Sequence, residues 1–113
     1  MTDLDKQMSA NAHLVEYRAK AGDLAEYARQ VDHLAYFPKR SRDDAAADLS
    51  AAGFHVTSIR RGLRRCCFEF SREDAVHLEA ANAFTREVVA VVDRHGGEYD
   101  GWASFLVEEP PTA

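Results

Sequence analysis

The order in which strand-like and helix-like segments alternate is the strongest constraint that this sequence places on its fold. Residues 31–37 and 54–60 alternate side chains with the period of a β-strand. A compact Arg61-Gly62 turn leads from the second of these into a returning strand over 63–70, because glycine tolerates the positive φ that tight hairpins require. A last strand is predicted over 99–107.

Two helices are predicted between these strands. Ser41 and Asp44 form a capping-box signal, and Gly53 is placed to end the helix that they begin. Ser71 opens the second helix with the same signal, and Gly96-Gly97 ends it. Its apolar face, with the spacing of an amphipathic helix, consists of His77, Ala81, Phe84, Val88 and Val91.

The first 28 residues add a helical segment, in which Asp23 is placed to cap a short second piece through Ala28. The full order is helix, β, α, β, β, α, β. It predicts an α+β, ferredoxin-like sandwich: one four-stranded antiparallel sheet with two helices on one face. We predict an N-terminal helical extension at 1–28 that packs on a sheet edge or on the open face, the domain at 29–109 and a short tail at 110–113.

Composition limits the classes of function. Fourteen Lys and Arg against 19 Asp and Glu give a net charge of -5, which opposes non-specific nucleic-acid binding. No apolar run is long enough for a membrane span, and the acidic N-terminus does not resemble a signal peptide. Cys66 and Cys67 are adjacent, so in a strand their side chains point to opposite faces. We expect a cytoplasmic protein without metal or cofactor, and no motif indicates a catalytic site.

Four arginines form a basic cluster within six residues around the predicted hairpin turn: Arg60, Arg61, Arg64 and Arg65. As a functional surface, the cluster would bind RNA or an acidic protein face. As a structural device, which we favour, charged side chains keep an exposed strand edge from pairing with other chains. The hairpin also lacks the stacking aromatics that an RNA-recognition strand carries after its Arg-Gly pair.

The most unusual segment follows the long predicted helix: Gly97, Glu98, Tyr99, Asp100, Gly101 and Trp102. In a regular strand, Tyr99 and Gly101 share one face, and Asp100 and Trp102 share the other. Glycine inside a strand often marks a bulge. The segment is therefore either a recognition surface with aromatic and acidic side chains, or the start of a strand whose aromatics are core residues. On the pattern alone, the core interpretation is favoured.

This segment resembles the C-terminal signature of the regulator of ribonuclease E activity B (RraB) family. The similarity extends over roughly residues 29–107, through the helix that ends at Gly53, the Arg-rich hairpin and the long helix. The resemblance implies a ferredoxin-like α+β fold. It also implies a non-catalytic, cytoplasmic regulator of RNA turnover that binds the scaffold portion of the endoribonuclease.

The leading hypothesis is therefore a protein that inhibits or modulates a ribonuclease E-like endoribonuclease through protein–protein contact. We predict that its partner-binding surface comprises Glu98, Tyr99, Asp100, Gly101 and Trp102. Three alternatives stay open: an immunity-type protein that blocks a nuclease toxin, an RNA-binding domain that uses the Arg60–Arg65 hairpin, and a small-ligand regulatory domain. The sequence leaves open whether the chain forms a homo-oligomer.

Overall fold

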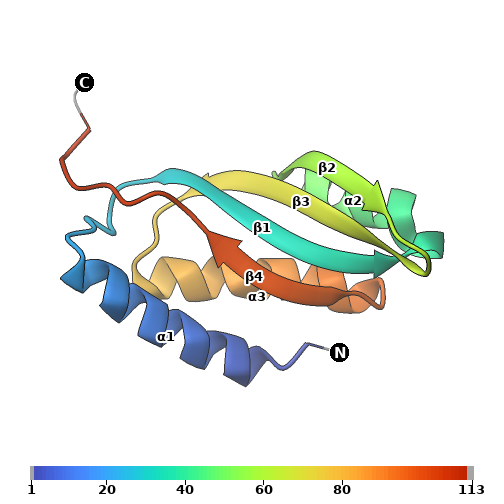
Figure 1. Ribbon diagram of the computed structural model, residues 1–113, viewed down its shortest axis with the longest axis horizontal. Coiled ribbons are helices and arrows are strands. Elements are labelled where there is room, and N and C mark those ends of the chain that lie inside the picture. The colour runs from blue at the N-terminus through green and yellow to red at the C-terminus, as the bar shows by residue number, and fades with distance from the viewer. Residues whose placement is uncertain (1, 112–113) are drawn as a thin grey trace.

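The computed structural model describes residues 2–111, which form a four-stranded antiparallel sheet with helices packed against it (Figure 1). The elements in chain order are α1 (Leu4–Lys20), β1 (Arg29–Pro38), the 3₁₀ helix η1 (Lys39–Ser41), α2 (Arg42–Ala51), β2 (His55–Arg61), β3 (Arg65–Asp74), α3 (Leu78–Arg94) and β4 (Glu98–Ala103). Of the tail predicted at 110–113, residues 112 and 113 lie outside the described residues.

The strands lie in the order β2-β3-β1-β4, and all neighbours are antiparallel. This is the strand order of the ferredoxin-like fold, so the predicted α+β sandwich with an extra N-terminal helix is confirmed. Helix α1 lies beside α3 next to β4, at one edge of the sheet (Figure 1). Among the helices of residues 2–111, none is both long and apolar enough to cross a membrane.

The core lies between the sheet and the helices. As the alternating pattern predicts, one face of β1 and one face of β3 are buried: Val31, His33, Ala35, Phe37, Cys66, Phe68 and Phe70. The apolar residues of α3 pack onto these strands, and Ala81, Phe84, Val88 and Val91 are buried as predicted. No helix of residues 2–111 covers the opposite face of the sheet, which is called the open face below (Figure 1).

The predicted start of α3 is wrong, whereas α2 begins directly after Ser41, as predicted. Ser71 lies inside β3, where it pairs with Asp32, and α3 begins only at Leu78. The residue that caps α3 is His77, whose ring nitrogen accepts a hydrogen bond from the Ala80 N–H at 3.2 Å. Ser41 is the N-cap residue of α2, as predicted, but its side chain makes no capping hydrogen bond. The backbone of Ser71 is already engaged in β3, so this serine has no free helix end to cap.

The short helix predicted after Asp23 is also absent from the described chain, where turns lead from α1 to β1. The Asp23 carboxylate instead binds Arg29 Nη1 at 2.6 Å and Arg18 Nε at 3.3 Å. Two guanidinium partners in the protein interior outcompete the capping of a single short turn. Asp23 thus joins α1 to the beginning of β1.

The hairpin between β2 and β3 closes as predicted, but for a different reason. Gly62 does not have a positive φ; an added Cβ there would lie 2.7 Å from the Arg65 carbonyl oxygen. Glycine is therefore needed for close backbone approach. A bulge between Val56 and Ser58 also changes the predicted alternation, because it turns Ile59 toward the core.

Candidate protein-binding site on the open face

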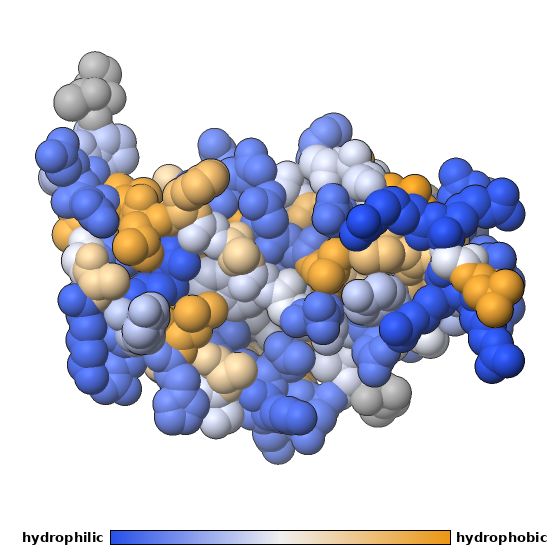
Figure 2. Space-filling view, in the orientation of Figure 1, coloured by the Kyte–Doolittle hydropathy of each residue, from blue (hydrophilic) through white to orange (hydrophobic). Residues whose placement is uncertain are grey.

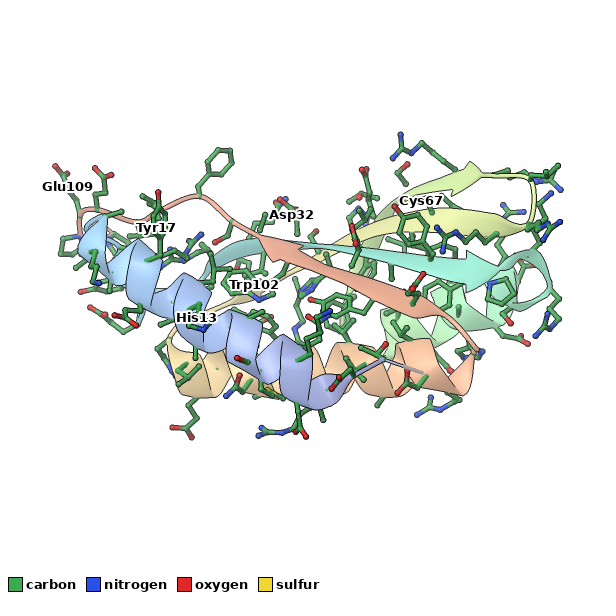
Figure 3. All side chains as sticks on the ribbon, turned by 60° about the horizontal axis from the view of Figure 1, so that its bottom comes forward. His13, Tyr17, Asp32, Cys67, Trp102 and Glu109 are labelled. Carbon is green, nitrogen blue, oxygen red and sulfur yellow. The ribbon has the colours of Figure 1, made fainter. Side chains whose placement is uncertain are left out.

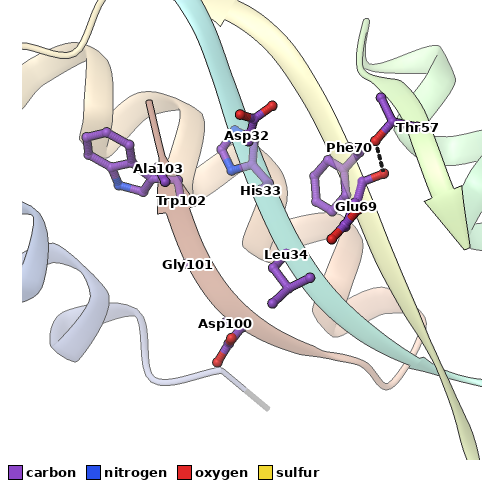
Figure 4. A pocket seen from close by; sticks show the side chains of 10 residues that line it. All are labelled: Asp32, His33, Leu34, Thr57, Glu69, Phe70, Asp100, Gly101, Trp102 and Ala103. Carbon is purple, nitrogen blue, oxygen red and sulfur yellow. Dashed lines mark hydrogen bonds between the residues drawn. The ribbon is translucent and has the colours of Figure 1, made fainter. Parts of the chain in front are cut away.

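A groove with a volume of about 530 Å³ lies on the open face, and all four strands contribute residues to its lining (Figure 4). We call it the acid groove because three carboxylates, those of Asp32, Glu69 and Asp100, line it. Leu34 forms part of its floor between them. Four strands hold the lining residues, so the groove is fixed by the sheet rather than by a loop.

Two β-bulges border the acid groove on opposite sides. In β2 the extra residue is Thr57, whose hydroxyl donates to the Glu69 carbonyl oxygen at 3.0 Å (Figure 4). In β4 the extra residue is Asp100, since Leu34 pairs with Gly101 and Ala35 pairs with Tyr99. Each bulge widens its ladder locally, and bulges are common where a sheet presents a functional side chain.

The carboxylates of the acid groove are only weakly compensated. Glu69 faces Arg60 at 3.8 Å, and both side chains are exposed. Asp32 accepts a hydrogen bond from the Gln30 amide at 2.8 Å. Within residues 2–111, neither Asp32 nor Asp100 forms a salt bridge. The groove therefore attracts cations, and it has an uncharged floor that accepts the aliphatic part of a lysine or arginine side chain.

The structure separates the predicted partner-binding residues into an outer and an inner group. Glu98 and Asp100 are exposed, and Gly101 lies in the wall of the acid groove with a φ of +121°. The bulge places Tyr99 and Trp102 on the same, helix-covered side of the sheet, which corrects the predicted alternation. Tyr99 is buried, in agreement with its interpretation as a core residue, and Trp102 is partly buried.

Beneath the groove, Tyr99 is held by a buried histidine. The Tyr99 hydroxyl lies 2.8 Å from His33 Nδ1, and the His33 ring stacks on Phe70. Burial, together with the charge of Arg72, lowers the pKa of His33 to about 3, so the ring is neutral at pH 7. Burial also raises the pKa of Tyr99. This pair fixes β1 to β4 directly below Asp100 and Gly101.

Trp102 connects the same strand to the N-terminal helix (Figure 3). Its indole N–H donates to Asn11 Oδ1 at 2.9 Å, and the Asn11 amide donates to Thr85 Oγ1 at 2.9 Å. The indole also packs edge-on against Phe84, with ring centroids 5.2 Å apart. Asn11 thus joins α1, α3 and β4, and it is a residue that sequence patterns did not single out.

The arginine cluster lies at the far end of the molecule, on the β2–β3 hairpin, where hydrophilic side chains gather in Figure 2. Arg65 pairs with Glu98 at 2.8 Å and lies over the Tyr36 ring at 4.1 Å. Arg60 faces Glu69. Arg61 and Arg64 are exposed and have no salt bridge within residues 2–111. Two of the four arginines, Arg60 and Arg65, thus form ion pairs with acidic residues of other strands.

Sequence reasoning missed the groups that shape the site from below. Asn11, Asp23 and His33 are each polar, buried and bonded to residues far away in the chain. The spacing of residues along the sequence does not predict hydrogen bonds between such distant residues. The one available signal was Gly101, whose place inside a strand indicated the bulge. Within residues 2–111, no three His, Cys, Asp or Glu side chains converge as metal ligands would.

Comparison with known proteins supports the resemblance seen in the Glu98–Trp102 segment. The chain matches the family described as Regulator of ribonuclease activity B over residues 9–104. Proteins with that name from Actinobacillus succinogenes and Aeromonas hydrophila are 29% and 30% identical to it over 69% and 58% of this chain. The one from Idiomarina loihiensis is 26% identical over 95% of this chain and 88% of its own length.

The match covers only 58% and 62% of the length of the first two relatives, so this chain corresponds to part of each. The matched residues 9–104 include most of α1, the whole sheet and the acid groove. They make up most of the described chain. The chain belongs to the Regulator of ribonuclease activity B family.

Proposed function

We propose that this chain is a non-catalytic regulator that binds a ribonuclease E-like endoribonuclease and lowers its activity in the cytoplasm. The observation that carries the proposal is the acid groove. It is an uncovered, negatively charged surface that lies against the segment in which the family resemblance is concentrated. The family is described as a regulator of ribonuclease activity, which supports a ribonuclease as the partner.

The charge of the groove selects the part of the ribonuclease that it would bind. Endoribonucleases bind a polyanion, and their RNA-binding segments carry lysine and arginine for this purpose. A segment of that composition would place its cations beside Asp32, Glu69 and Asp100. Exposed ion pairs contribute only about 0.2–1 kcal/mol each, so the carboxylates mainly steer the encounter and fix its register. When this chain occupies the basic segment of the ribonuclease, that segment is no longer available to RNA.

The proposal is tested with purified ribonuclease from the same host, a labelled RNA substrate and three forms of this chain. The wild-type chain is expected to slow cleavage and to cleave no RNA by itself. The double variant Asp32→Asn, Asp100→Asn is expected to need at least tenfold more protein for the same inhibition, because both substitutions keep the shape and remove the charge. The control double variant Glu26→Gln, Glu79→Gln also removes two exposed carboxylates and is expected to inhibit like the wild type.

Two outcomes would overturn the proposal. If the wild-type chain neither binds the ribonuclease nor slows cleavage at low salt, then the partner is wrong. If both double variants lose inhibition equally, net charge is what matters and the acid groove is not the binding site.

A further inference from the structure

The chain that follows β4 leaves the sheet but keeps a fixed conformation. Arg18 donates from Nη1 to the Ser104 carbonyl oxygen at 3.1 Å and from Nη2 to the Ser104 hydroxyl at 2.7 Å. The Phe105 carbonyl oxygen accepts from Arg18 Nη2 and from Arg29 Nη1, each at 3.1 Å. Two guanidinium groups from different elements therefore hold the backbone of an irregular segment.

Asp23 holds both of these arginines. Its side chain is only 1% exposed and binds Arg18 and Arg29 through different carboxylate oxygens. It also accepts from the Val107 N–H at 2.9 Å, while the Val107 carbonyl oxygen accepts from the Leu24 N–H at 2.7 Å. Residues 104–107 are thus fastened on both sides of Phe105. We call Arg18, Asp23 and Arg29 the clamp.

The clamp holds the backbone of Phe105 in place, while 88% of Phe105 is exposed. A single exposed apolar residue is ordinary on a protein surface, so the exposure of Phe105 gains meaning only from the way its backbone is held. Here a buried ion cluster, which is costly to desolvate, fixes an irregular segment that buries little of its own. The leucine that follows, Leu106, is exposed as well. Figure 2 shows hydrophobic side chains gathered at the end of the molecule from which the C-terminal segment leaves.

A rigidly held, exposed aromatic side chain is suited to protein binding. Its backbone loses little conformational entropy when a partner arrives, and a buried phenylalanine ring contributes far more than an exposed ion pair. Energetic hot spots in interfaces are commonly such anchors, surrounded by weaker polar contacts. The acid groove supplies polar contacts of this kind and lacks an anchor of its own.

Phe105 and the acid groove are continuous. Ala103 lies in the wall of the groove opposite Asp32, and Phe105 follows it by two residues. Ser104, between them, directs its hydroxyl to Arg18. Beyond Phe105 the chain adds two more exposed acids, Glu108 and Glu109. A partner that covers both features would therefore present an apolar surface next to basic side chains.

We propose that Phe105 is the apolar anchor of the ribonuclease-binding surface, packing against aliphatic or aromatic side chains of a partner segment whose lysines or arginines enter the acid groove. This inference rests on the proposed function and specifies the chemistry of the segment. The clamp pre-organises the anchor, and the groove sets its register.

The test compares Phe105→Ala with Leu63→Ala. Leu63 is 89% exposed, lies on the β2–β3 hairpin and makes a matched control. Affinity for the ribonuclease is measured by surface plasmon resonance at two salt concentrations. Phe105→Ala is expected to weaken binding about 30-fold, mainly through faster dissociation and with an unchanged salt dependence. Leu63→Ala is expected to stay within twofold of the wild type. Both variants are expected to keep the wild-type unfolding temperature.

The outcomes separate this inference from the proposed function. If Phe105→Ala binds like the wild type while Asp32→Asn, Asp100→Asn binds weakly, the groove is the site and the anchor is wrong. If the wild type does not bind the ribonuclease, both the proposed function and this inference are wrong. Sedimentation of the chain alone tests whether Phe105 binds a second copy of the chain instead of the ribonuclease. A dimer that Phe105→Ala converts to a monomer would assign Phe105 to self-association and overturn the inference.

Discussion

The Tyr99 hydroxyl and His33 Nδ1 lie 2.8 Å apart inside the protein, and they join the edge strand β4 to the central strand β1. His33 Nε2 is buried and has no hydrogen-bond partner within residues 2–111. Phe54, Phe70 and Phe84 surround the imidazole ring. In this setting a protonated imidazole would have no acceptor for its second N–H, so the pair is stable only while His33 is neutral.

The first prediction concerns the pH dependence of folding. The pKa of His33 is about 3 in the folded protein and about 6.5 in the unfolded chain, so between these values the unfolded state binds the additional proton. The contribution of His33 to stability is therefore fully present well above pH 6.5 and is lost progressively as the pH falls from there toward 3. Between pH 7 and pH 5, His33 accounts for a loss of about 2 kcal/mol in the free energy of unfolding. Urea denaturation at the two pH values measures it.

Two variants check that this loss belongs to His33. His33→Leu is expected to be less stable at pH 7 but to lose about 2 kcal/mol less than the wild type on going to pH 5. His13→Ala removes an exposed histidine and is expected to keep the full wild-type pH dependence. Equal pH slopes for the wild type and His33→Leu would show that the histidine titrates normally in the folded state.

The second prediction concerns the attachment of α1. Asn11→Ala removes the acceptor of the Trp102 indole N–H and the donor to Thr85, which is fully buried. Leaving these groups unpaired is expected to lower the free energy of unfolding by about 1–3 kcal/mol. Trp102 is the only tryptophan, so its fluorescence reports the change directly. Unchanged stability and emission in Asn11→Ala would contradict the role assigned to this residue.

The third prediction addresses the arginines of the hairpin. Strand β2 is an edge strand, and Arg60 and Arg61 are exposed on it. If they protect this edge, Arg60→Val, Arg61→Val is expected to associate at concentrations at which the wild type stays monodisperse in light scattering. The matched control Arg86→Val, Arg94→Val replaces two exposed arginines of α3 and is expected to remain dispersed.

Filter binding distinguishes edge protection from RNA binding by the same hairpin. We expect no retention of single-stranded RNA at physiological salt, because the net charge is -5 and Arg60 and Arg65 already face acids. Salt-dependent retention that disappears in Arg61→Ala, Arg64→Ala would instead show that the hairpin binds RNA.

The order of elements was predictable because each segment carries its own period. Strands β1 and β3 bury every second residue, and α3 buries a continuous stripe, so the sequence alone indicates both the sheet and its covering. The Ser41 signal predicted the start of α2, but the Ser71 signal did not predict the start of α3. Ser71 pairs with Asp32 across the sheet, and that pairing depends on where β1 lies rather than on the neighbours of Ser71 in the chain.

The details of the site depended on contacts between distant residues. The bulge at Asp100 reverses the side on which Trp102 lies, although the strand itself was expected. The clamp joins Arg18, Asp23 and Arg29 to residues 104–107, and only the folded chain brings these segments together. Acidic residues near the motif were visible in the sequence. Their convergence around Leu34 required the antiparallel register of β1, β3 and β4.

The most direct test of the account is an NMR titration of the isotopically labelled chain with the purified ribonuclease. We expect the amide signals of residues 31–35, 69 and 98–106 to shift or broaden, since these residues form the acid groove and lead to Phe105. The exposed sides of α2 and α3 are expected to keep their signals. Changes confined to those helices or to the hairpin tip, or no changes at all, would contradict the claim that the open face binds the enzyme.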